Sequence, residues 1–178
     1  MKPVFATALS VGVLGALCTW MFLSVGTILV WSAFVAWACF FHSGGDTAAF
    51  KSTVVSNTFG CVMGWLGAVM ILGLPLGEAL TPQVWSGTVV LVTVVVYILA
   101  SQIPAFASVP GTTYGYACTF AFLLQTPEKL NLGALFSASF NNSLIVVPVS
   151  MLLGACFGLA SARLAAALTK PELLPASP

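Results

Sequence analysis

The chain has 178 residues, of which 60% are hydrophobic and only 5% are charged, and its formal net charge at pH 7 is +1. A soluble domain carries about 25% charged residues because its outside must be solvated by water, so this composition excludes an ordinary soluble protein and predicts an integral membrane protein. The small net charge and the lack of a basic run exclude a nucleic-acid partner, which leaves the lipid bilayer as the predicted surroundings.

Apolar segments separated by proline, glycine or charged residues define the predicted membrane spans. A membrane-crossing helix needs about 20 apolar residues. In chain order the predicted spans cover residues 4–24, 27–41, 53–74, 85–103, 111–124 and 137–164. The predicted fold class is therefore all-α, a polytopic membrane protein with six transmembrane helices, of which the second and fifth are short or broken.

The linker SGGDTAAF, between the second and third spans, is the most polar stretch in the first half of the chain. Its glycines permit a sharp turn, and Asp46 or Thr47 could cap the helix that follows. One interpretation is a bent linker that lines a water-filled cavity, because irregular backbone is tolerated at membrane depth only there or inside protein. The alternative is a plain cytoplasmic loop with ordinary turn residues.

The two halves of the chain resemble each other weakly. Trp37-Ala-Cys-Phe-Phe aligns with Tyr116-Ala-Cys-Thr-Phe, residues 49–57 align with residues 134–142, and a Gly-x-x-x-Gly pair follows in each half, at Gly60 and Gly154. Three spans per repeat is an odd number, so the second repeat must enter the membrane inverted, which is a recurrent plan for transporters. We therefore expect a 3+3 inverted repeat with one three-helix repeat at residues 1–77, the other at 78–166, and a disordered cytoplasmic tail at 167–178.

The basic residues predict the orientation of the spans. With six spans, one side of the membrane holds Lys2, Lys51, Arg163 and Lys170, and the other side holds only Lys129. Because basic residues favour the cytoplasmic side, both termini are predicted to be cytoplasmic.

Polar and aromatic residues within or beside the spans are the candidate solute-binding residues. An asparagine amide in hydrocarbon is costly unless it is paired, so such groups face protein or water. The candidates are Asn57, Asn142, Ser52, Ser56, Ser137, Trp37, Phe41 and Tyr116. The alternative roles are hydrogen bonds between helices for the polar residues and anchoring at the membrane interface for the aromatic ones.

The sequence gives no indication of an enzyme, a metal site or a cofactor. The five cysteines form no CxxC pair, and the only histidine, His42, has no second ligand at metal-binding spacing. No nucleophile has a neighbouring base, and no phosphate-binding glycine loop is present. No Asp, Glu, Lys or Arg lies near the middle of a predicted span, where an ion-coupled transporter usually holds one.

Two stretches, WACFFHSGGDTAAFKSTVVSNTFG and IPAFASVPGTTYGYACTFAF, carry a resemblance to a known family. The chain resembles the YcdZ-like family of small bacterial inner-membrane proteins of unknown function. The resemblance implies a multi-pass location in the bacterial inner (plasma) membrane. In size and span count the chain is also similar to small bacterial channels for urea, amides, formate or ammonia, although it has none of their signature residues.

These features favour a passive channel or facilitator for a small polar, mostly uncharged solute such as urea, ammonia or a short amide. We expect a homo-oligomer, because so small a chain encloses little surface. Two alternatives stay open: a non-transporting membrane assembly or partner subunit that uses its glycine stripes as an interface, and a channel for a small anion such as formate.

Overall fold

The computed structural model describes residues 1–74 and 76–169, and every regular element in these two ranges is helical, which confirms the predicted all-α class. In chain order the elements are α1 (Pro3–Val25), α2 (Val30–His42), α3 (Thr47–Gly73), α4 (Leu76–Ala79), α5 (Pro82–Ala100), η1 (Pro104–Phe106), α6 (Val109–Gln125), η2 (Pro127–Lys129), α7 (Leu132–Leu135) and α8 (Ser143–Leu168). Within the described residues, α1, α3, α5 and α8 are long and apolar enough to cross a membrane, whereas α2 and α6 are shorter.

Glycine turns end the first two helices where the sequence predicts breaks. Gly26 follows α1 with a φ of 75°, and its N–H donates to the carbonyl of Phe22, as in a left-handed C-cap. Gly44 and Gly45 both have positive φ and turn the chain between α2 and α3. The side chain of Asp46 then accepts a hydrogen bond of 2.7 Å from the backbone N–H of Ala49, which confirms Asp46 as the N-cap of α3.

Two helix boundaries differ from their predicted positions. Helix α3 begins at Thr47 rather than near residue 53, because the exposed Lys51 in its second turn can extend a long side chain away from apolar surroundings. Helix α8 begins at Ser143 rather than near residue 137, after an irregular segment. It also continues to Leu168, so the predicted disordered tail starts too early, and residues 170–178 of that tail lie outside the described residues.

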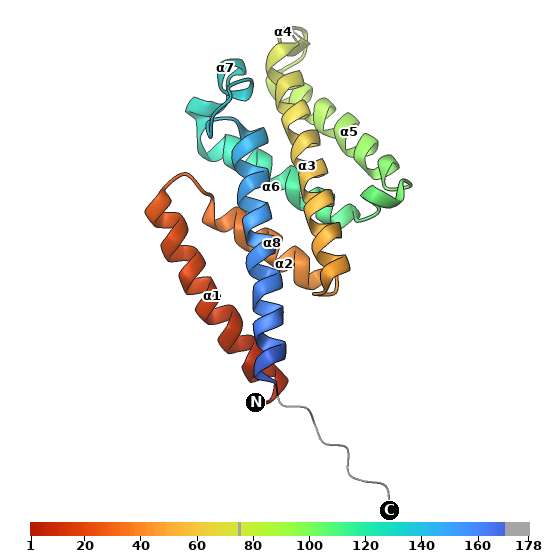
Figure 1. The fold of residues 1–178 in the computed structure, drawn as a ribbon. Coiled ribbons are helices and arrows are strands. Elements are labelled where there is room, and N and C mark those ends of the chain that lie inside the picture. The colour runs from red at the N-terminus through yellow and green to blue at the C-terminus, as the bar shows by residue number, and fades with distance from the viewer. Residues whose placement is uncertain (75, 170–178) are drawn as a thin grey trace, which may run out of the picture.

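Helices α3 and α8 form the centre of the bundle and run side by side in opposite directions (Figure 1). Helix α1 packs on α8 at one flank and α5 packs on α3 at the other (Figure 1). The two shorter helices cross over to the central helix of the other half, because α2 packs most extensively on α8, and α6 on α3. The start of α1 and the end of α8 meet, and the amino group of Met1 donates to the carbonyl of Leu168 at 3.1 Å.

Glycines allow the backbones to touch at these crossings. A Cβ added to Gly60 would collide with the carbonyl of Thr112, and one added to Gly154 would collide with the carbonyl of Ala33. Close approach through small residues is a common means of packing helices in membranes. The glycine stripes thus join each long central helix to a short helix of the other half of the chain.

Large apolar side chains cover the outside of the bundle. Val4 is 77% exposed, Leu23 69% and Leu124 68%, and many similar side chains accompany them. Such a surface is unfavourable in water and suits a hydrocarbon surrounding. Among the cysteines, Cys156 is exposed on α8, whereas the other four are buried.

Candidate functional site

The interior of the bundle contains polar side-chain atoms that find no hydrogen-bond partner among the described residues. They are Ser32 Oγ, Thr53 Oγ1, Ser56 Oγ, Asn57 Oδ1, Thr112 Oγ1 and Ser143 Oγ. Burying a polar group without a partner costs roughly 1–3 kcal/mol by the evidence of protein mutants. Several such groups in one bundle call for an explanation, such as a bound water that completes their hydrogen bonds.

Three of these atoms belong to residues at one helix crossing, where α3 meets the first turns of α6. Ser56 lies against Gly111, since a Cβ added to Gly111 would come within 2.8 Å of the Ser56 Cβ. The carbonyl of Asn57 lies against Gly115, and Thr112 lies against Gly60 of the facing helix. We call Ser56, Asn57 and Thr112 the α3–α6 polar cluster, and their exposed fractions are 1%, 2% and 1%.

Two of the other unpartnered polar atoms have thiol neighbours, which are weak hydrogen-bonding groups. The Thr53 hydroxyl lies near the Cys39 thiol, and the Ser32 hydroxyl near the Cys118 thiol, but neither pair has hydrogen-bond geometry. The Cys61 thiol, one turn beyond Asn57 on α3, donates to the Gly115 carbonyl at 3.5 Å. The polar group that the hydrogen bonds place beside Asn57 at this crossing is therefore a weak one, the Cys61 thiol.

The predicted site residues on α3 lie together, but deeper in the helix than the sequence interpretation placed them. Ser56 and Asn57 are buried and Ser52 is half-buried on the same helix. Because α3 begins at Thr47 and not near residue 53, Asn57 lies in the third turn of the helix. The structure thus places Ser56 and Asn57 inside the bundle, next to α6.

Asn142 and Ser137 lie elsewhere, in the segment that precedes α8. Asn142 is the N-cap of α8, and its Oδ1 accepts from the N–H of Leu144 at 2.9 Å. Its Nδ2 donates to the carbonyl of Ser137 at 3.0 Å. The predicted equivalence of Asn57 and Asn142 is therefore wrong in structural terms, because Asn57 Oδ1 is unpartnered within a helix, whereas Asn142 is a helix cap whose amide oxygen and nitrogen both form hydrogen bonds.

The aromatic candidates have separate partners. The Nε1–H of Trp37 donates to Ser161 Oγ on α8 at 3.1 Å, and the hydroxyl of Tyr116 hydrogen-bonds Thr93 Oγ1 on α5 at 2.9 Å. Phe41 is 39% exposed near the end of α2. These side chains lie in helix interfaces or at the surface, and the contacts do not bring the three together as one site.

Thr112 is the member of the polar cluster that sequence reasoning missed. It lies in the stretch PGTTYGY, where hydroxyls and glycines interrupt an otherwise apolar span. Thr112 and Gly115 are three residues apart on one face of α6, and this face meets α3. That spacing was the available signal, but it could be interpreted only with the partner helix known.

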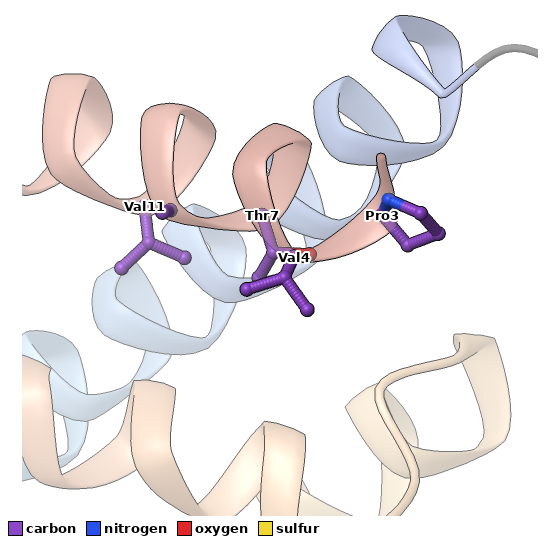
Figure 2. Close-up of a pocket in the computed structure, with 5 residues that line it drawn as sticks. Pro3, Val4, Thr7 and Val11 are labelled. Carbon is purple, nitrogen blue, oxygen red and sulfur yellow. The ribbon is translucent and has the colours of Figure 1, made fainter. Parts of the chain in front are cut away.

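Surface grooves surround the bundle. The groove on α1 has a volume of about 510 Å³ and a mostly apolar lining of Pro3, Val4, Thr7, Ala8 and Val11 (Figure 2). A second apolar groove, of about 410 Å³, lies between α2 and α6 and includes Trp31 and Tyr114. A third, of about 360 Å³, is polar and includes Lys129, Ser137 and Asn141. Of these three grooves, the third offers several polar groups, and it lies over η2 and the segment around α7.

These features define the class of protein. An all-helical chain with few charges, four long apolar helices and an apolar outside is an integral membrane protein. The chain belongs to DUF1097, a protein family of unknown function, whose model matches residues 8–166. No curated protein and no solved structure matches the chain.

Proposed function

We propose that the protein is a passive facilitator for a small polar, mostly uncharged solute, such as urea, ammonia or a short amide. The observation that carries the proposal is the α3–α6 polar cluster, whose three buried oxygens lack partners among the described residues. Such atoms are costly inside an apolar bundle unless water or a solute pairs with them. A solute passing the cluster would replace water there, which lowers its barrier to crossing the bilayer.

A 3+3 inverted repeat, with α1, α2 and α3 matched to α5, α6 and α8, is part of the proposal. In the alignment of Trp37 with Tyr116, Ala33 precedes Trp37 by four residues, as Thr112 precedes Tyr116. Gly60 of α3 contacts Thr112, and Gly154 of α8 contacts Ala33. The second glycine of each pair shows the same correspondence. Gly64 contacts Thr119, which lies three residues after Tyr116, and Gly158 contacts Phe40, which lies three residues after Trp37.

That correspondence supports the repeat more strongly than sequence similarity does. Apolar sequences match by chance. Here, however, both glycine contacts of α3 with α6 have a counterpart between α8 and α2 under the same alignment of Trp37 with Tyr116. Inverted repeats with short helices at matching places are typical of proteins that move solutes across membranes. We therefore propose that the facilitator is an inverted repeat. We also propose that it is a YcdZ-like member of its family and lies in the bacterial inner membrane.

The distribution of charge favours passive over ion-coupled transport. Asp46 and Lys51 lie at the start of α3, and Arg163 lies near the end of α8, so the centres of α1, α2, α3, α5, α6 and α8 hold no charged residue. Ion-coupled transporters usually hold a charged residue within the membrane to bind the coupling ion or relay a proton. In this proposal the solute therefore moves through the protein down its own concentration gradient.

The rival role, a non-transporting partner subunit, loses its main argument. That role required the glycine stripes as a free interface. Gly60, Gly64, Gly154 and Gly158 instead contact α6 or α2 within the same chain. Homo-oligomerisation stays part of the proposal, on the general ground that small membrane proteins often assemble as symmetric rings.

The direct test is flux in proteoliposomes. We expect purified protein to increase urea or ammonia permeability above that of protein-free vesicles, measured by stopped-flow light scattering or by an internal pH dye. The control is protein that has been heat-denatured before reconstitution. Well-folded protein that raises the permeability of none of these solutes would contradict the proposed function.

The proposed orientation makes a second prediction. Lys2→Cys and Lys51→Cys should react with a membrane-impermeant maleimide only after cells are permeabilised, whereas Glu128→Cys should react in intact spheroplasts. The reason is that the basic residues mark the cytoplasmic side. The parent chain is the control, because its cysteines are buried apart from Cys156 on apolar α8. Labelling of Lys51→Cys and Glu128→Cys from the same side would refute the inverted arrangement.

A further inference from the structure

The α3–α6 crossing and the α2–α8 crossing differ in polarity although their backbone contacts correspond. When Gly60 is matched to Gly154, Ser56 is matched to Ser150, each four residues before its glycine. Asn57 is then matched to Met151, each three residues before its glycine. Thr112 is matched to Ala33 through the glycine contacts. Two of the three polar cluster residues therefore have apolar counterparts.

The third counterpart, Ser150, is already satisfied. Its hydroxyl donates to the carbonyl of Val146 at 2.6 Å and accepts from the backbone N–H of Leu29 at 3.0 Å. Met151 is 2% exposed and its sulfur contacts the Cys61 thiol at 3.8 Å. The α2–α8 crossing thus has no unmet hydrogen-bonding group at the three matched positions. The unpartnered Ser32 Oγ, next to Ala33 on α2, has the Cys118 thiol of α6 as its neighbour.

The chemistry of the cluster restricts the solute that it can bind. The hydroxyls of Ser56 and Thr112 can rotate to donate or to accept, but the Oδ1 of Asn57 can only accept. A partner for this oxygen must supply an N–H or O–H proton. Urea, amides and ammonia can supply one, whereas a deprotonated anion such as formate presents only acceptor oxygens.

We propose that the solute is bound in one half of the molecule only, at the α3–α6 polar cluster, and that it must donate a hydrogen bond to Asn57 Oδ1. The inference rests on the proposed function and makes it more specific. It assigns the α2–α8 crossing a packing role. It also excludes small anions that lack a proton to donate from the transported class.

The test combines thermal stability with flux for two variants, Ser56→Ala and Thr112→Val, the second of which keeps the side-chain shape. Removing a buried hydroxyl that has no protein partner should leave the melting temperature unchanged or raise it. The same change removes a solute contact, so urea flux should fall about tenfold, equivalent to about 1.4 kcal/mol. A purely structural hydroxyl would show the opposite pattern, with lower stability and unchanged flux per folded protein.

Two matched controls lie in the other half. Ser150→Ala should lower the melting temperature, because it leaves the N–H of Leu29 unpaired, and should keep urea flux per folded protein. Met151→Leu, at the position matched to Asn57, should change urea flux less than twofold. Wild-type vesicles should conduct urea but not formate, a planar anion of similar size.

The outcomes separate this inference from the proposed function. If wild-type protein conducts urea and both cluster variants conduct equally well, or if both variants lose stability, the cluster is not the solute site and only this inference is overturned. Formate conduction equal to that of urea would overturn the requirement for a hydrogen-bond donor. If the wild type conducts neither urea nor ammonia, the proposed function fails and this inference fails with it.

Discussion

Gly60→Ala and Gly154→Ala are each expected to prevent normal assembly of the helix bundle. In both cases the added methyl group would overlap a backbone carbonyl of the facing helix, that of Thr112 or of Ala33. A side chain can rotate away from a clash, but a helix backbone can yield only if the whole helix moves. Overpacking of a core usually costs about 1–3 kcal/mol and occasionally more, and we expect these variants to lie at or above the top of that range.

The measurement is the yield of monodisperse protein in mild detergent, followed by the melting temperature of whatever is recovered. Gly12→Ala and Gly87→Ala are the matched controls, because both glycines are helical and nothing lies within 4 Å of an added Cβ. Alanine favours helix by roughly 1 kcal/mol over glycine, so the controls should be at least as stable as the parent. A Gly154→Ala protein that melts like the parent would show that α2 and α8 do not touch as described.

Asn57→Leu and Asn142→Leu are expected to fail in different ways. Asn57→Leu removes an unpaired acceptor, so it should fold normally while urea flux falls about tenfold to hundredfold, the effect of about 1–3 kcal/mol at a solute contact. Asn142→Leu removes the N-cap of α8 and the bond to the Ser137 carbonyl. Each contribution is worth about 1 kcal/mol, so this variant should lose about 2 kcal/mol of stability.

Stopped-flow flux and thermal melting of the same preparations distinguish the two results. Asn141→Leu is a suitable control, because the neighbouring Asn141 is exposed. If Asn57→Leu does not fold, the amide holds helices together and is not a solute contact. If it folds and conducts like the parent, Asn57 contributes neither to the path nor to the packing.

The helices were predictable because their ends carry strong local signals. Gly26, the Gly44-Gly45 pair and the Asp46 cap set boundaries that follow from backbone conformation and hydrogen bonding over a few residues. The short length of α2 and α6 was predictable for the same reason, since turn residues bound both.

What the sequence did not show is which surfaces meet. A Gly-x-x-x-Gly pattern indicates a close contact but not its partner, and Gly60 and Gly154 contact the short helices rather than each other. The weak similarity between residues 49–57 and 134–142 aligned Asn57 with Asn142, whereas the contacts match Asn57 with Met151. An alignment of mostly apolar residues can slip by several positions at little cost in similarity, and only contacts across the bundle correct it.

The placement of the cysteines has a practical consequence for spectroscopy. Cys156 is exposed on α8, and Cys18, Cys39, Cys61 and Cys118 are buried. A lipid-soluble spin label or fluorophore should therefore attach to the unmodified chain at a single position. That probe would sit on the helix that packs against α1, α2 and α3, and its mobility would report movement at the centre of the bundle without any engineered cysteine.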